Sequence, residues 1–119
     1  MKILIVDDSD ITMKMIESTV QRFGFYSLNA VNGKDALQKI KQNTPNLIIY
    51  NSTPTNMNCY QFLKLLNNNN EYKNIPIIMI NETILDNIYH YTILEQLTRP
   101  FTPIELQIRL NRVFEMIKA

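Results

Sequence analysis

Short runs of consecutive apolar residues alternate along this chain with longer segments in which apolar residues recur every three or four positions. A run of consecutive apolar residues is expected of a strand that helices cover on both faces. Three stretches fit this description: residues 3–6, 47–50 and 75–80. We expect them to form central strands of one sheet.

Five further segments have the period of an amphipathic helix. The first ends at Gly24, a residue type common just past helix ends, and the second begins after Asn32 and ends by Pro45. The third ends in the asparagine run at 67–70, which we interpret as a surface turn. A fourth, with a weaker pattern, is predicted over residues 84–94. The fifth has a clear apolar stripe, formed by Leu106, Leu110, Val113 and Ile117.

This alternation predicts an α/β protein with five strand and helix pairs, in which a five-stranded parallel sheet is doubly wound and carries helices on both faces. Ligands of such sheets bind beyond the carboxyl ends of the strands, where the strand order reverses. The candidate site residues are therefore those that follow the apolar runs, together with one near the end of a short fifth strand. They are Asp7, Asp8, Asn51, Asn81 and Arg99.

Composition excludes several classes of protein. A chain of 119 residues, 45% of them hydrophobic, predicts one domain over residues 1–119. Twelve basic and eleven acidic residues leave a charge of +1, which favours neither nucleic acid nor a membrane surface as a partner. The single cysteine, Cys59, excludes an internal disulfide framework and indicates the cytoplasm. Asp7 and Asp8 interrupt the first apolar run too early for a signal peptide or a membrane span.

Four motifs in order give the chain a family resemblance. They read ILIVDD at 3–8, PNLIIYN at 45–51, PIIMIN at 76–81 and RPF at 99–101. Together they resemble the receiver domain of two-component response regulators over essentially the whole chain. The resemblance implies a flavodoxin-like (βα)5 sandwich that takes part in signal transduction by binding protein partners.

In that family an aspartate at position 51 accepts a phosphoryl group, and the acids at 7 and 8 help to hold Mg²⁺. A hydroxyl residue at 81 and a lysine at 99 contact the phosphoryl oxygens. This chain keeps only the two acids. An amide has no anionic oxygen to attack phosphorus, so the sequence predicts that Asn51 is not phosphorylated. With one carboxylate fewer, Mg²⁺ binding at Asp7 and Asp8 is expected to be weak or absent, and no other cofactor is expected.

The joint changes at 51 and 99 lead to a hypothesis about the pocket. Two neighbouring carboxylates repel each other unless a cation is close. We expect the guanidinium of Arg99 to pair with Asp7 or Asp8 in place of the metal, with Asn51 and Asn81 completing a neutral, hydrogen-bonded pocket.

The segment between positions 81 and 99 also departs from the family. It is about one helical turn shorter than usual, so the fourth helix, or a loop beside it, is expected to be trimmed. Gln96 replaces the aromatic residue that often changes rotamer on activation. Tyr89, His90 and Tyr91 cluster on the predicted fourth helix, where we interpret them, with Gln96, as an interaction surface. The Arg99–Pro100 peptide resembles a family position that is commonly cis.

These features predict a pseudo-receiver: not an enzyme, but a domain that acts by phosphorylation-independent protein contact. The expected surface is the face of the fourth helix, fifth strand and fifth helix, and a homodimer remains open. One alternative is a receiver-like sensor of a small ligand or anion near Asp8 and Arg99. A flavodoxin-like cofactor carrier using Ser9 and Thr12 as phosphate donors is disfavoured, because the adjacent acids repel phosphate. A phosphatase with an aspartate nucleophile would need a motif that the chain lacks.

Overall fold

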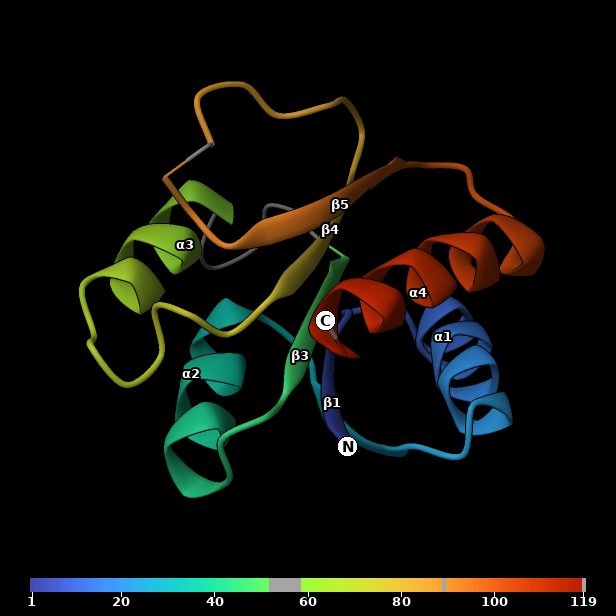
Figure 1. Cartoon of the computed structure of the whole chain (residues 1–119), viewed down its shortest axis with the longest axis horizontal. Helices are drawn as coiled ribbons and strands as arrows, with labels where there is room; N and C mark the ends of the chain where they lie inside the picture. The colour runs from blue at the N-terminus through green and yellow to red at the C-terminus, as the bar shows by residue number, and fades with distance from the viewer. Residues whose placement is uncertain (52–58, 89, 119) are drawn as a thin grey trace.

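The computed structural model describes residues 1–51, 59–88 and 90–118, which form one sheet between two helical layers (Figure 1). Strands and helices alternate along most of the chain, as the sequence predicts. The elements are β1 Lys2–Val6, α1 Asp10–Arg22, β2 Tyr26–Ala30, α2 Gly33–Gln42, β3 Leu47–Asn51, α3 Cys59–Asn67, β4 Ile77–Asn81, β5 Ile93–Thr98 and α4 Pro103–Lys118.

All neighbouring strands of the sheet are parallel, in the order β2-β1-β3-β4-β5. The order reverses between β1 and β3, since the chain moves outward to β2 and then returns to the other side of β1. In the register of these two strands Val6 lies opposite Tyr50. The next residues, Asp7 and Asn51, therefore meet at the carboxyl edge of the switch point, where sheets of this class bind ligands.

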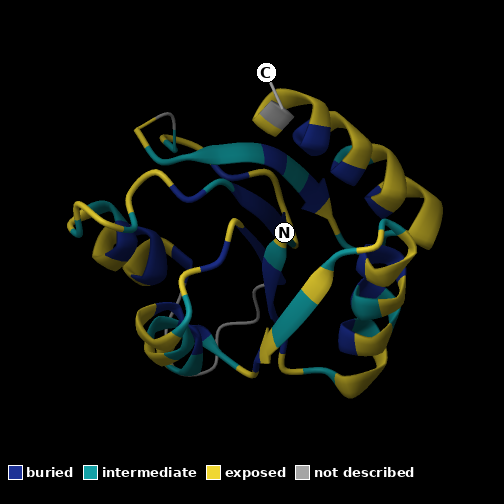
Figure 2. Cartoon of the chain, turned by 60° about the horizontal axis from the view of Figure 1, so that its bottom comes forward, coloured by how far each residue is buried: buried dark blue, intermediate teal, exposed yellow. Residues whose placement is uncertain are grey.

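Each face of the sheet has its own apolar core, and Figure 2 shows buried strands between helices whose outer sides are exposed. Alternate strand residues point to opposite faces. One face packs against α2 and α3, through Ala36, Ile40, Phe62, Leu63 and Leu66. The other packs against α1 and α4, through Met13, Ile16, Val20, Leu106, Leu110, Val113 and Phe114. The predicted fold class, a parallel sheet with helices on both faces, is confirmed.

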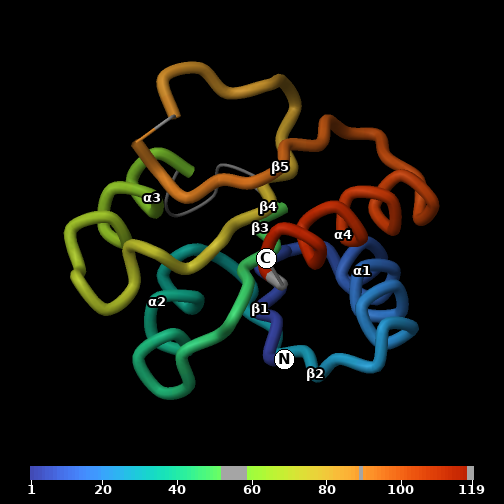
Figure 3. The backbone as a smooth tube through the Cα atoms, in the orientation of Figure 1, coloured from blue at the N-terminus to red at the C-terminus, as the bar shows by residue number. Residues whose placement is uncertain are grey.

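The predicted fourth helix is wrong. Residues 82–88 and 90–92 contain no helix, and β5 already begins at Ile93, so Leu94 belongs to the strand. Figure 3 shows the connection from β4 to β5 as an open arc. Too few residues separate the two strands for a stable helix together with the turns at its ends. The domain thus has four helices in its described part, and the predicted fifth helix is α4.

Two smaller details differ from the sequence pattern. β2 was not assigned, because an edge strand lacks the continuous apolar run of a central one and only Ala30 of its five residues is buried. In α4 the predicted stripe is correct at Leu106, Leu110 and Val113, but Ile117 is 36% exposed and Phe114 is buried instead. Phe114 is buried because its ring meets those of Phe23 and Phe25.

Tyr50 is a titratable group inside the core. Its side chain is 2% exposed, and its ring centroid lies 4.5 Å from that of Phe62. Burial, with a smaller contribution from the nearby Cys59, raises the pKa of the Tyr50 phenol to about 12. The phenol is therefore held in its neutral form well into the alkaline range.

Candidate functional site

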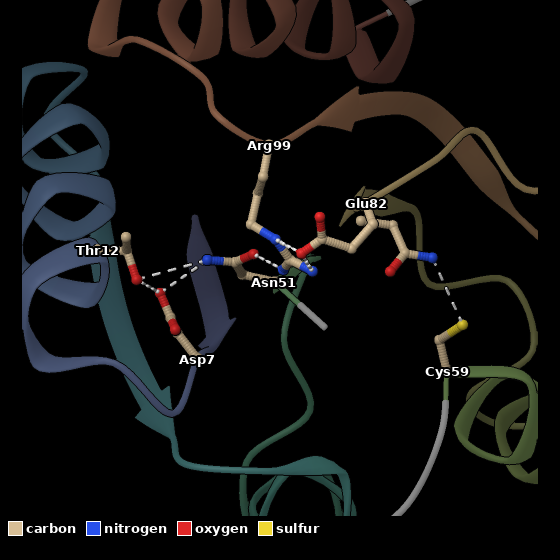
Figure 4. A network of polar contacts seen from close by, with 7 residues as sticks. Asp7, Thr12, Asn51, Cys59, Glu82 and Arg99 are labelled. Carbon is tan, nitrogen blue, oxygen red and sulfur yellow. Dashed lines mark hydrogen bonds and ion pairs between the residues drawn. The ribbon is translucent and has the colours of Figure 1, made fainter. Parts of the chain in front are cut away.

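The candidate site lies where β1, β3 and β5 end at the same edge of the sheet (Figure 4). Asp7 follows β1, Asn51 is the last residue of β3, and Arg99 follows β5. Asp7 and Asn51 are 3% and 5% exposed. A carboxylate and an amide at this depth need hydrogen-bond partners, and the structure supplies them.

Both carboxylate oxygens of Asp7 accept hydrogen bonds. The backbone N–H of Ser9 donates to Oδ1 at 2.9 Å. The hydroxyl of Thr12 and the amide nitrogen of Asn51 donate to Oδ2, the latter at 3.0 Å. Ser9 also caps α1, since its hydroxyl accepts from the backbone N–H of Thr12. Asp7 therefore joins the first turn of α1 to the end of β3.

The side chain of Asn51 is held at both ends, and the chemistry of its partners fixes its orientation. Its Nδ2 donates to Asp7, and its Oδ1 accepts from Nη1 of Arg99 at 2.6 Å. A carboxylate can only accept and a guanidinium can only donate. Exchanging the amide oxygen and nitrogen would therefore break both bonds. An amide matches this position better than a carboxylate would.

The ion pair of Arg99 corrects the hypothesis drawn from the sequence. Its guanidinium pairs with Glu82, not with Asp7 or Asp8: Nε and Nη2 donate to Oε1 of Glu82 at 3.1 and 3.0 Å. The reason is geometric, because the amide of Asn51 lies between Arg99 and Asp7 and bonds to both. Asp8, the next residue after Asp7, is exposed. Arg99 thus reaches the buried acid only through Asn51.

Asn81 does not complete this pocket as expected. Its side-chain nitrogen lies 3.9 Å from the sulfur of Cys59, at the start of α3. Its backbone oxygen accepts from the N–H of Arg99 at 3.0 Å, which continues the pairing of β4 with β5. The following peptide, Arg99–Pro100, is cis, as the resemblance suggested.

The residues present do not fit a Mg²⁺ site. Mg²⁺ needs oxygen atoms with free lone pairs in a near-octahedral arrangement. Oδ2 of Asp7 already accepts two hydrogen bonds and Oδ1 accepts one, and a guanidinium nitrogen lies 2.6 Å from the side-chain oxygen of Asn51. No group of three potential metal ligands from His, Cys, Asp and Glu occurs in the described ranges. Arg99 itself supplies a cationic group in contact with Asn51.

Gln96 has a structural role that its sequence position did not suggest. Its side-chain oxygen accepts from the backbone N–H of Leu85 at 2.7 Å, and its nitrogen donates to the backbone oxygen of Leu85 at 3.4 Å. One amide of β5 therefore satisfies both backbone groups of a residue in the β4–β5 connection. Together with the pair between Glu82 and Arg99, it attaches this connection to β5 at two points.

Replacing Gln96 with leucine is expected to loosen the connection. It leaves the backbone groups of Leu85 without these partners, and should lower the free energy of unfolding by about 1–2 kcal/mol. The amide proton of Leu85 should exchange with solvent faster. Gln96→Glu keeps a side-chain oxygen that can accept from the N–H of Leu85. It should therefore affect the exchange of that amide proton less than Gln96→Leu does. Hydrogen exchange followed by NMR measures both, and unchanged protection of Leu85 in Gln96→Leu would contradict this role.

The predicted aromatic cluster is only partly observed. Tyr89 lies outside the described residues. His90 is exposed, with its ring centroid 4.1 Å from that of Tyr91. Tyr91 is half-buried and packs against the core beneath α2 and α3, and its backbone N–H donates to Ile88 at 2.9 Å. His90 and Tyr91 therefore belong to a loop and not to a helix.

The sequence did not indicate two members of the polar network, Glu82 and Thr12, as site residues. Glu82 follows β4 directly, and an acid at a strand end of this sheet could have indicated a site residue. Its pairing with Arg99 nevertheless depends on the path of the connection. Thr12, a phosphate donor only in the cofactor-carrier alternative, donates its hydroxyl to Asp7.

A five-stranded parallel sheet with a polar network at its switch point defines a flavodoxin-like α/β protein. Residues 3–111 match the family model described as the response regulator receiver domain. The chain therefore belongs to this family. It is 30% identical over 119 residues to the chemotaxis protein CheY1 of Helicobacter pylori strain J99, covering 95% of this chain and 96% of that protein.

Two further similarities agree with this assignment. The chain is 31% identical to protein PilG of Pseudomonas aeruginosa over 81 residues, which make up 68% of this chain and 60% of that protein. The structure of the chemotaxis protein CheY4 of Vibrio cholerae superposes with a TM-score of 0.82 at 28% identity, covering 94% of this chain and 97% of the other. No helix in the described ranges has the length and apolar character needed to cross a membrane.

Proposed function

We propose that this chain is a receiver domain that signals by binding a protein partner, without phosphoryl transfer to position 51. Membership of the receiver family supports a role as a signalling module and not as an enzyme. The absence of a cysteine framework supports a place in the cytoplasm. The remaining question is whether the pocket at the switch point still performs the family's chemistry.

The observation that carries the proposal is the side chain of Asn51, bonded at one end to Asp7 and at the other to Arg99. Phosphoryl acceptance requires an anionic oxygen that can attack phosphorus, and a neutral amide offers none. Its only oxygen lies 2.6 Å from a guanidinium nitrogen, so it is not available as a metal ligand either. The two hydrogen bonds of Asn51 favour a pocket whose polar side chains are held in one arrangement.

The test is incubation of the protein with Mg²⁺ and acetyl phosphate, followed by intact mass spectrometry. We expect no phosphoryl adduct. The Asn51→Asp variant, which has a nucleophile at the same place, is the matched control for access of the donor. An adduct on the unchanged Asn51 side chain, located by peptide mapping in material free of deamidation, would overturn the proposal.

We place the partner surface on the face made by β5, α4 and the β4–β5 connection. A hollow of about 340 Å³ lies on this face, and its lining includes Ile84, Ile93 and Leu94 together with the charged Glu95 and Arg109. Apolar side chains rimmed by charges are typical of protein contact sites. The same face can serve a protein of the signalling pathway or a second copy of this chain.

A further inference from the structure

A cavity of about 330 Å³ lies beside the polar network, on the side of α1. Its lining comes from three elements that meet at the switch-point edge: the first turns of α1, the end of β4, and the connection from β5 to α4. Small-ligand sites are typically hollows of this size with mainly apolar walls and a few polar groups. The lining residues are Thr12, Met15, Glu82, Arg99, Pro100 and Phe101.

The cationic group in this wall is the guanidinium of Arg99, which has unused donors. A guanidinium has five N–H bonds. Three of them donate to Asn51 and Glu82, and within the described part of the chain the other two have no acceptor. The side chain is 17% exposed, so its charge is only partly shielded by water. Arg99 can therefore hold an additional anionic oxygen.

Glu82 is the anion that pairs with Arg99 in this structure. A single oxygen of Glu82 accepts from both Nε and Nη2, and its side chain is 75% exposed. An ion pair with one partner in solvent contributes at most about 1 kcal/mol. A carboxylate with a second, apolar point of attachment nearby can therefore compete with Glu82. Met15, Pro100 and Phe101 supply that attachment.

We propose that this cavity binds an organic monoanion, a small carboxylate with a compact apolar body, and that its carboxylate replaces Glu82 on Arg99. The apolar walls exclude inorganic phosphate as the preferred ligand, since they offer no further donors and the carboxylate of Asp7 lies close to Asn51. This site goes beyond the proposed function, because it involves no covalent step and no protein partner. Release of Glu82 would leave the β4–β5 connection attached to β5 through Gln96.

Benzoate and its neutral isostere benzyl alcohol are suitable probes. In an NMR titration of the whole chain we expect benzoate to give saturable shifts at Met15, Phe101 and the Nε–H of Arg99. Benzyl alcohol should bind at least about five-fold more weakly, since it lacks the charge. Glu82→Gln removes the internal competitor and should strengthen benzoate binding about two- to five-fold. Arg99→Met should abolish the preference for benzoate over the alcohol.

Three results would overturn the proposal. They are equal affinity for the two probes, unchanged benzoate affinity in Glu82→Gln, and the absence of saturable shifts at the cavity residues. Because Glu82 is exposed, its substitution should leave the fold intact, so this arm remains decisive even if Arg99→Met is unstable. None of these results depends on whether Asn51 is phosphorylated, so failure of this site is distinct from failure of the proposed function.

Discussion

Substitution of Asn51 by aspartate is expected to destabilise the protein in the absence of Mg²⁺. The change removes the hydrogen bond from Nδ2 to Asp7 and places a second carboxylate oxygen where the two atoms are now 3.0 Å apart. Two buried carboxylates at that distance repel each other, although Arg99 offsets part of the new charge. We expect the free energy of unfolding to fall by about 2 kcal/mol, and the melting temperature by roughly 5–10 °C.

Mg²⁺ should affect the stability of the two proteins differently. The variant gains an anionic ligand next to Asp7, so millimolar Mg²⁺ should recover part of its lost stability by binding the folded state. The natural chain should show no shift in melting temperature under the same conditions. Asn111→Asp, on the exposed side of α4, is the matched control for added charge. Thermal unfolding with and without Mg²⁺ measures the effect, and equal stability of Asn51→Asp and the unchanged chain would refute it.

Alkaline pH should destabilise the protein through Tyr50. The folded state raises the pKa of this phenol from its ordinary value of 10.0 to about 12. Above pH 10 the unfolded chain therefore loses the phenolic proton while the folded chain retains it. The contribution of this pKa shift to the free energy of unfolding is thus fully present below pH 10 and is lost as the pH rises toward 12. A shift of this size corresponds to about 2–3 kcal/mol.

Tyr50→Phe isolates this contribution, because the variant keeps the ring against Phe62 and removes only the titrating hydroxyl. All other titratable side chains are the same in the two proteins. Denaturant unfolding at several values between pH 9 and 12 should show the unchanged protein losing more stability than the variant by about 2–3 kcal/mol. If the free energies of unfolding of the two proteins fell equally with rising pH, the phenol would not be shielded from solvent.

The sequence predicted the features of this fold that depend on local burial. The central strands and the helices beside them were recognised because each has a continuous or periodic apolar pattern that its neighbours do not alter. The meeting of Asp7, Asn51 and Arg99 was predictable for a related reason, since the carboxyl ends of parallel strands share one edge. The resemblance to receiver domains then supplied the order of the elements.

The β4–β5 connection was not predictable in this way. Its path is set by the side chains of Gln96 and Arg99, and these contacts join residues that the chain order separates. Leu85 and Ile88 are spaced like helix residues and both face the core, although the segment that carries them is not helical. The identity of the partner of Arg99 was missed for the same reason, since Glu82 reaches it only when the connection takes this path.

The attachment of the connection to β5 determines which substitutions the domain can tolerate. A helix distributes its hydrogen bonds over every residue, whereas in the described residues 82–88 the connection is held by contacts with two side chains outside it, those of Gln96 and Arg99. Thr83 and Asp86 are exposed and would vary freely in a mutational scan. Substitutions at positions 96 and 99 would be selected against, although both lie outside the segment whose shape they maintain.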